Sequence, residues 1–160
     1  MKSPALTLLS RLLPLSNVTL DLDATSKKRL FEHAGLAFEN NQKISRGEVF
    51  ESLFAREKLG STGLGQGVAI PHGCVKGIRE AVGAFLRLSN PVPFDAPDGK
   101  PVSLVFILLV PERATDLHLQ ILSELAQLFS DRSMREHLLS AESAEAAHKL
   151  IVEWKPNAPG

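Results

Sequence analysis

The chain has 160 residues, with 18 lysines and arginines balanced by 18 aspartates and glutamates, so its formal net charge is zero. This balance excludes a general electrostatic attraction to nucleic acid or to an acidic membrane surface. A single cysteine, Cys74, excludes an intramolecular disulfide framework, and no apolar run reaches the roughly 18 residues of a membrane-spanning helix.

The first elements are short. Apolar residues over 6–13 favour a brief helix packed on the body of the protein, and alternation over 17–22 favours a strand. The residues expected on one face of that strand are Val18, Leu20 and Leu22.

Two longer helices follow. Apolar residues recur at helical spacing from Ser26 until the pattern stops at residues 40–41. A second helix is predicted from Ser45, because Ser45 and Glu48 match the S-x-x-E capping box. Its last turn carries Arg56, which the helix brings close to the glycine-rich segment that follows.

Strands dominate the middle of the chain. They are predicted over 68–70 and 81–88, and a proline-rich loop is expected over 90–100. The run over 102–110 is too apolar to be half exposed, so it should be a central strand covered on both faces. We therefore expect helices on both sides of a sheet.

The last third of the chain predicts helices. One begins near Thr115 or Asp116 and ends before Asp131, with His118 in its first turn. Two shorter helices fit residues 131–139 and 143–154. We expect one domain over 1–154, followed by a flexible tail over 155–160.

The segment over 60–73 combines glycines, hydroxyl side chains and a histidine behind a short apolar run. Glycines allow backbone N–H groups to gather around a small anion, and Ser61 and Thr62 add hydroxyl donors. Pro71 should end the preceding strand, so that His72 opens a turn. The segment therefore predicts an anion site beside a reactive imidazole.

Phosphoryl transfer is the chemistry that suits this arrangement. His72 follows one strand and His118 begins a helix after another, so both should reach one crevice at the strand ends. A hydrogen bond from Nδ1–H to a backbone carbonyl would aim Nε2 of His72 outward as the nucleophile. We predict that His72 carries a phosphoryl group, stabilised by the glycine segment, Ser61, Thr62, Arg56 and His118, with no metal or other cofactor.

The motif R-E-x-x-G-S-T-G over 56–63, followed by I-P-H-G over 70–73, resembles the enzyme IIA domains of the fructose and mannitol phosphotransferase class. More narrowly, it resembles the free-standing nitrogen-regulatory enzyme IIA. The resemblance implies an α/β fold with a mixed sheet of about five strands and helices on both faces. It also implies that His72 accepts phosphate from an HPr- or NPr-like histidine phosphocarrier protein. In this reading His118 is the second active-site histidine and Arg56 is the arginine beside it.

The same resemblance implies the surroundings and the output of the site. We expect Ser61, Thr62, Gly63 and Gly73 to bind the phosphoryl group. The output is expected to be regulatory, because phosphorylated and unphosphorylated forms bind targets such as potassium transporters or sensor kinases differently. A cytoplasmic protein without membrane insertion is expected.

Other readings stay open. The chain could be a sugar-specific IIA component that passes phosphate to a IIB domain, or an anion-binding module without chemistry. A zinc site of His72, Cys74 and His118 would lack a convincing fourth ligand. Arg56 could only complement the negative end of the helix dipole, and His118 could simply be a polar residue in the first turn of an amphipathic helix, without a role in the site. A P-loop is excluded because it would need lysine at Gln66.

Overall fold

The computed structural model describes residues 8–113 and 115–155. Most of the tail expected over 155–160, and the first two residues of the helix expected over 6–13, lie outside the described residues. The elements in chain order are α1 (Leu8–Leu12), η1 (Leu15–Asn17), β1 (Val18–Leu22), α2 (Lys27–Gln42), α3 (Arg46–Leu59), β2 (Gly63–Gly65), β3 (Val68–Ala69), β4 (His72–Val75), β5 (Val82–Val92), β6 (Val102–Pro111), α4 (Thr115–Ser130), α5 (Arg132–Ser140) and α6 (Ala144–Val152).

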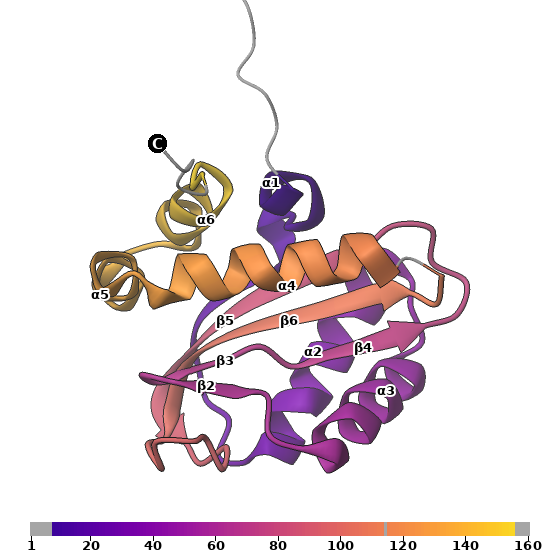
Figure 1. Ribbon diagram of the computed structural model, residues 1–160, viewed down its shortest axis with the longest axis horizontal. Helices are drawn as coiled ribbons and strands as arrows, with labels where there is room; N and C mark the ends of the chain where they lie inside the picture. Colours follow the sequence, from indigo (N-terminus) through magenta and orange to yellow (C-terminus); the bar gives the residue numbers. More distant parts are fainter. Residues whose placement is uncertain (1–7, 114, 156–160) are drawn as a thin grey trace, which may run out of the picture.

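A six-stranded mixed sheet forms the centre of the molecule (Figure 1). Its order is β1-β5-β6-β3-β2, and β4 also pairs with β6. Strand β5 is antiparallel to β6, whereas β3 and β4 are parallel to β6 and β1 is parallel to β5. All of β6 except Ser103 and Pro111 is buried, which confirms the prediction of a central strand over 102–110.

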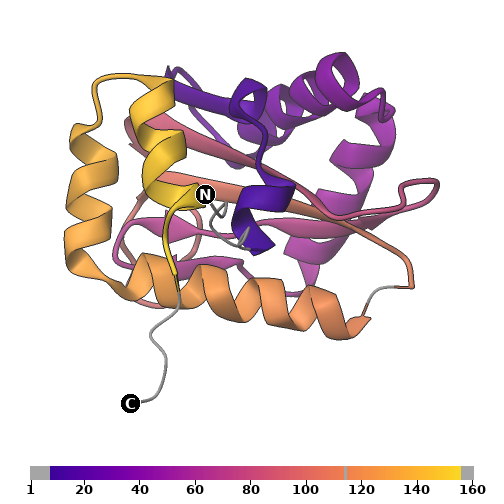
Figure 2. The same ribbon diagram turned by 90° about the horizontal axis from the view of Figure 1, so that it is seen from above.

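Helices cover both faces of the sheet, as expected. Figure 2 shows α2 and α3 on one side and α4 on the other, and α1, α5 and α6 pack on the α4 side. Side chains of β6 alternate between the two apolar cores, because successive residues of a strand point to opposite faces. Val105, Ile107 and Leu109 join the α2–α3 core, and Leu104, Phe106, Leu108 and Val110 join the other.

The prediction that one face of β1 carries all three apolar residues is wrong for Leu22. Val18 and Leu20 belong to the core under α4, but Leu22 packs against the core under α2 and α3. The pairing register with β5 shifts between Thr19 and Leu22, and Asp21 has a φ of 56°. Such a bulge adds a residue to the strand and turns the next side chain to the opposite face.

The helix starts were predicted with mixed success. Ser26 caps α2 as a side-chain acceptor from the Arg29 N–H at 3.1 Å. The capping box at Ser45 is wrong, since Ser45 makes no side-chain cap bond. Instead, Glu39 of α2 accepts the Arg46 N–H at 3.0 Å, so a carboxylate from the neighbouring helix replaces the local cap.

Strands β2 and β4 were not predicted. The segment over 60–67 is not an open loop, because β2 and β3 pair antiparallel around Gln66 and Gly67, whose φ angles are 58° and 78°. Two positive φ values are the signature of a two-residue type I′ hairpin. Strand β4 also raises the expected five strands to six, and β5 extends to Val92, beyond the predicted end at residue 88.

The carboxy-terminal helices follow the prediction closely. Helix α4 begins at Thr115 and ends at Ser130, and Asp131 and Ser143 cap α5 and α6 with side-chain acceptors. Across residues 8–113 and 115–155, no helix has both the length and the apolar character that crossing a bilayer requires.

Candidate functional site

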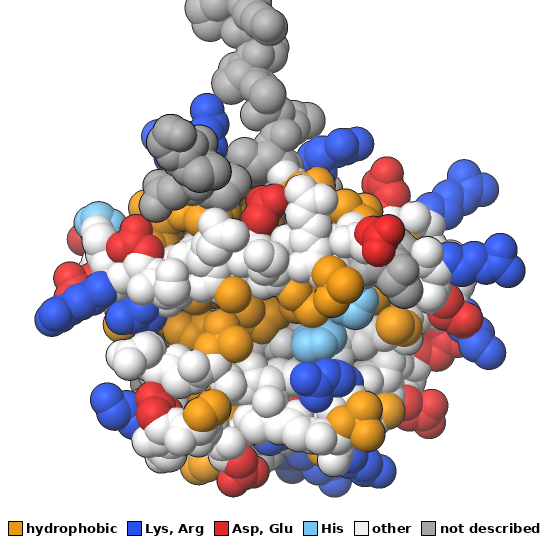
Figure 3. Space-filling model, in the orientation of Figure 1, with side chains coloured by type: hydrophobic (Ala, Val, Ile, Leu, Met, Phe, Trp, Pro, Cys, Tyr) orange, Lys and Arg blue, Asp and Glu red, His pale blue; other side chains and the backbone are white. Residues whose placement is uncertain are grey.

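His72 and His118 lie side by side, as the sequence predicted. Their ring centroids are 5.5 Å apart, with an angle of 74° between the ring planes. His72 opens β4 and is paired in register with Leu108, whereas His118 stands in the first turn of α4, which follows β6. The face seen in Figure 3 carries two adjoining histidine side chains with a basic side chain beside them.

The backbone before His72 defines the position of its imidazole. Pro71 does interrupt the chain between β3 and β4, but its carbonyl accepts the Leu108 N–H at 2.9 Å, and the strand resumes at His72. The prediction of a turn at His72 is therefore wrong. Nδ1 of His72 lies 2.9 Å from the carbonyl oxygen of Ile70. Because a carbonyl can only accept, Nδ1 carries the proton, and Nε2 has a free lone pair.

Burial favours the neutral form of both imidazoles. Burial lowers the pKa of His72 below its ordinary value of 6.5, and the nearby positive charge of Arg56 lowers it further, against the opposing hydrogen bond to the Ile70 carbonyl. Burial also lowers the pKa of His118 below 6.5. A neutral ring is the nucleophilic form of histidine, so His72 is chemically competent near pH 7.

These lowered pKa values predict how stability depends on pH. In the unfolded chain both histidines have an ordinary pKa of about 6.5, so between that value and the lower folded values the unfolded state binds more protons. The free energy of unfolding should therefore rise with pH through this window and decline as the pH falls from 6.5 through the folded values. Urea unfolding between about pH 5 and pH 7 measures this, and a His72→Gln/His118→Gln double variant should flatten the slope. An imidazole titration of His72 with its midpoint at or above 6.5 would contradict the prediction.

His118 contributes a nitrogen that lacks a partner. Within the described part of the chain, no residue forms a hydrogen bond with its buried Nε2. A buried polar atom without a hydrogen bond lowers the stability of a folded protein by about 1–3 kcal/mol. The first turn of α4 also lies at the positive end of the helix dipole, where an anion is favoured. The surroundings of His118 are therefore suited to a polar, negatively charged ligand.

Arg56 supplies the fixed positive charge near His72. It occupies the last turn of α3, and its Nη1 donates to the carbonyl oxygen of Gly60 at 2.9 Å. Its charge disfavours protonation of His72, so the guanidinium acts electrostatically on that ring. The expectation that α3 brings Arg56 to the start of the glycine-rich segment is met by this contact.

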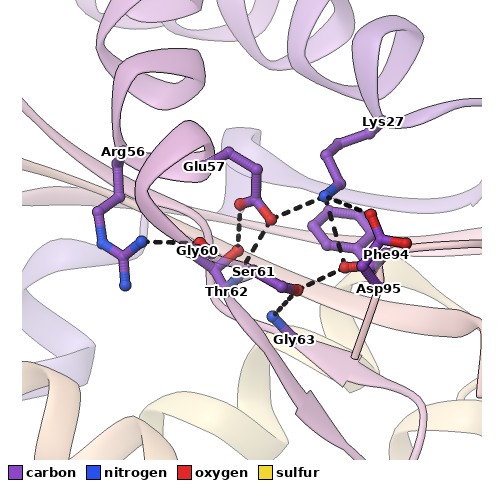
Figure 4. A network of polar contacts seen from close by, with 9 residues as sticks. All are labelled: Lys27, Arg56, Glu57, Gly60, Ser61, Thr62, Gly63, Phe94 and Asp95. Atoms are coloured by element: carbon purple, nitrogen blue, oxygen red, sulfur yellow. Dashed lines mark hydrogen bonds and ion pairs between the residues drawn. The ribbon is translucent and has the colours of Figure 1, made fainter. Parts of the chain in front are cut away.

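The hydroxyl groups after Gly60 already have partners inside the protein (Figure 4). Ser61 donates its hydroxyl proton to the carbonyl of Phe94 and accepts the Gly63 N–H at 3.0 Å. Thr62 donates both its backbone N–H and its hydroxyl to Glu57, at 3.1 and 2.6 Å. A phosphoryl group could use these donors only by displacing these bonds. The phosphate-binding role of Ser61, Thr62 and Gly63 stays a prediction.

Two residues of this network were missed by sequence reasoning. The side chain of Glu57 is only 5% exposed, and Lys27 from the start of α2 pairs with it at 2.8 Å. The signal for Glu57 was its place in the R-E motif, directly after Arg56. No sequence spacing indicates Lys27, which reaches the site only because α2 packs beside α3.

Gly73 allows α3 to pack closely against β4. A Cβ at this position would lie 2.6 Å from Oγ and 2.9 Å from Cβ of Ser52, which stands one turn before Arg56 in α3. Any larger residue would push the helix away from the strand that carries His72. The predicted contact of Gly73 with phosphate remains a prediction beside this packing role.

Three leucines in elements that carry or adjoin site residues are exposed at the surface. Leu59, Leu64 and Leu119 are 84%, 46% and 65% exposed. Leu59 ends α3, Leu64 lies in β2, and Leu119 follows His118 in α4. Figure 3 shows apolar surface beside the two histidine side chains. Apolar surface of this kind is typical of a protein-binding face.

The zinc alternative has no geometric support. Among residues 8–113 and 115–155, no three His, Cys, Asp or Glu side chains are grouped so as to hold a metal ion, and His72, Cys74 and His118 do not form such a group. Cys74 is an exposed free thiol.

Comparisons with known proteins agree on one family. Residues 11–154 match the family described as "Phosphoenolpyruvate-dependent sugar phosphotransferase system, EIIA 2". A "Nitrogen regulatory protein" from Pseudomonas aeruginosa is 42% identical over 146 residues, which cover 91% of this chain and 95% of that protein. The crystal structure of nitrogen regulatory protein IIA-Ntr from Neisseria meningitidis is 59% identical, with a TM-score of 0.86, and the match covers 91% of this chain and 99% of that one.

A more distant structure is similar in fold. The complex of enzyme IIAMTL and phosphorylated enzyme IIBMTL from Escherichia coli contains a chain that is 23% identical, with a TM-score of 0.74. That match covers 88% of this chain and 98% of the other. At this level of identity the likeness shows the fold alone.

Proposed function

The chain belongs to the EIIA 2 family of the phosphoenolpyruvate-dependent sugar phosphotransferase system, and within this family of phosphoryl-transfer domains we propose that it is a phosphohistidine relay protein with a regulatory output. In this proposal His72 accepts a phosphoryl group from a small histidine phosphocarrier protein of the HPr or NPr kind. The phosphorylated and free forms then bind cytoplasmic targets differently.

The observation that carries the proposal is the arrangement of His72. Its Nδ1–H is directed to the Ile70 carbonyl at 2.9 Å, which leaves the lone pair of Nε2 free in a ring whose pKa is lowered by burial. In the transfer, Nε2 forms a new P–N bond while the P–N bond of the donor phosphohistidine breaks, and the donor imidazole keeps the electron pair. The proton stays on Nδ1, which donates it in a hydrogen bond to the Ile70 carbonyl throughout.

The groups around His72 are suited to stabilise the negative charge of the migrating phosphoryl group. Transfer of this kind depends on alignment and on electrostatic stabilisation of the phosphoryl oxygens. Arg56 provides a fixed positive charge, and the unpartnered Nε2 of His118 provides a hydrogen-bonding group once it carries the ring proton. Ser61, Thr62, Gly63 and Gly73 complete the proposed phosphate-binding group, which Ser61, Thr62 and Gly63 would join by giving up their present hydrogen bonds.

The exposed leucines support a protein as the partner. Figure 3 shows apolar surface beside the two histidine side chains, which a small sugar phosphate would not need. Leu59, Leu64 and Leu119 are exposed on elements that carry or adjoin site residues. A phosphoryl group with a charge near −2 at the centre of this face changes which surfaces can dock on it. Potassium transporters and sensor kinases are the proposed classes of regulated target.

A sugar-specific IIA component is the second candidate. It would pass the phosphoryl group of His72 to a IIB domain, and the fold shared with enzyme IIAMTL supports it. The 42% and 59% identities with nitrogen regulatory proteins favour the regulatory role over this one.

Phosphorylation with purified components tests the proposal. The protein should acquire one acid-labile, alkali-stable phosphoryl group when it is mixed with phosphoenolpyruvate, the first enzyme of the system and a histidine phosphocarrier, and none when the carrier is omitted. Binding of the free and phosphorylated forms to candidate targets then tests the regulatory output. A protein that takes no phosphate from any histidine phosphocarrier would contradict the relay role.

A further inference from the structure

Glu57 is a buried carboxylate that lies beside the proposed reaction centre without contacting the reacting nitrogen. Its side chain is 5% exposed, although it lies near the end of α3, where most glutamates would face water. Both of its oxygens are used: Oε1 accepts the Thr62 hydroxyl, and Oε2 accepts the Thr62 N–H and the Lys27 ammonium. Figure 4 shows these contacts converging on the one carboxylate.

A continuous series of hydrogen bonds joins this carboxylate to His72. Glu57 holds Thr62 by two bonds, and the Thr62 carbonyl accepts the Ile70 N–H at 3.0 Å. The opposite side of the same residue, the Ile70 carbonyl, accepts the Nδ1–H of His72 at 2.9 Å. Ile70 therefore donates its N–H to Thr62 and accepts the imidazole N–H of His72 at its carbonyl.

Lys27 pairs with the carboxylate of Glu57 inside the protein. A buried carboxylate is tolerated only beside a positive partner and several donors. Lys27 lies 2.8 Å from Oε2 of Glu57, and its Nζ also lies 4.6 Å from the centre of the Phe94 ring, in cation–π geometry. The network thus ties α2, α3 and the segment before β2 to one another through one carboxylate.

We infer that Glu57 is a positioning residue for His72, which acts through Thr62 and Ile70 to keep the imidazole in the Nδ1–H tautomer with Nε2 available. The effect on phosphoryl acceptance rests on the proposed function, whereas the effect on the tautomer of His72 rests on the hydrogen bonds alone. Loss of the carboxylate frees Thr62, lets the 60–70 segment shift and weakens the bond between the Ile70 carbonyl and Nδ1. The imidazole then populates the Nε2–H tautomer, whose protonated Nε2 cannot attack phosphorus.

The test is the tautomer of His72 in protein that has met no phosphate donor. Nitrogen-15 shifts of the neutral imidazole should show mainly the Nδ1–H form in the wild type and a substantial share of the Nε2–H form in Glu57→Gln. The rate of phosphoryl acceptance by this variant should fall on the order of tenfold or more, since small misalignments of reacting groups have effects of this size. Glu51→Gln, an exposed carboxylate on the same helix, is the matched control and should change neither quantity.

Substitutions at Thr62 keep the test decisive if Glu57→Gln does not fold. Thr62→Val keeps the shape but loses the hydroxyl bond to Glu57, so it should shift the tautomer in the same direction, whereas Thr62→Ser keeps that bond and should leave the tautomer in place. An unchanged tautomer in folded Glu57→Gln, or in Thr62→Val, would overturn the inference even if the wild type is phosphorylated normally. A tautomer shift in a protein that never accepts phosphate would uphold the positioning role of Glu57 and refute the relay function.

Discussion

Replacing His72 with glutamine should abolish the transfer of an acid-labile phosphoryl group to this protein while the chain still folds. Glutamine can still donate an amide N–H to the Ile70 carbonyl, but its amide nitrogen has no available lone pair. Loss of the proposed nucleophile should lower the rate on the order of a thousandfold or more, to the limit of detection. Radiolabelled phosphoenolpyruvate with the phosphocarrier system measures the transfer, and circular dichroism checks the fold.

The neighbouring histidine provides the matched control. His118 lies 5.5 Å from His72 between ring centroids, but we assign it to charge stabilisation and not to bond formation. His118→Gln should therefore reduce the rate and still give a phosphorylated protein. Phosphoryl label on the His72→Gln protein would show that His72 is not the acceptor. If, in addition, the His118→Gln protein took up no label, His118 would be the acceptor instead.

Replacing Gly73 with alanine should destabilise the protein and lower phosphoryl acceptance together. The new Cβ would lie 2.6 Å from Oγ of Ser52 and 3.0 Å from its backbone carbonyl carbon, so rotation of the serine side chain cannot remove the clash. Helix α3 must then move away from β4. Overpacking of this kind costs about 1–3 kcal/mol, which urea unfolding resolves easily. Since α3 carries Arg56 and Glu57 and β4 carries His72, the shift also separates the groups of the site.

A glycine on the same helix is the control for this second prediction. A Cβ at Gly47 would meet only Oγ of Ser45 at 3.8 Å, an ordinary contact. Gly47→Ala should therefore leave the site intact and stabilise α3 by up to about 1 kcal/mol, because alanine has the better helix propensity. Equal urea midpoints for Gly73→Ala and the wild type would contradict the prediction, because they would show that α3 can move away from β4 without loss of stability.

Helix α3 links the predictions made for this site. Ser52 defines its distance from β4, Arg56 gives the positive charge, and Glu57 anchors the segment that leads to Ile70. One rigid helix thus controls the spacing, the charge and the tautomer of the proposed acceptor. A site built on such an element holds its geometry better than one built on a free loop.

Sequence patterns alone predict the larger elements and the two histidines of the site. The helices α2, α3 and α4, and the buried strand β6, follow from apolar periodicity, which depends only on the repeat of each kind of backbone and on burial. The nearness of His72 and His118 followed from a second rule, because strand ends and helix starts meet at one edge of such a sheet. The first of these conclusions uses residues close to one another along the chain, and the second combines two such local patterns with a general rule of sheet topology.

The hydrogen-bond partners of the polar groups become known only from the folded chain. Glu39 replaced Ser45 as the cap of α3, Lys27 reached Glu57 across 30 residues, and the hydroxyl groups after Gly60 bonded inward. The glycine-rich segment forms the hairpin of β2 and β3 through local pairing around Gln66 and Gly67. A hydrogen-bonding group is satisfied by whichever complementary group the packed chain brings within about 3 Å. For Lys27 and Ser61 that partner is 30 and 33 residues away along the chain.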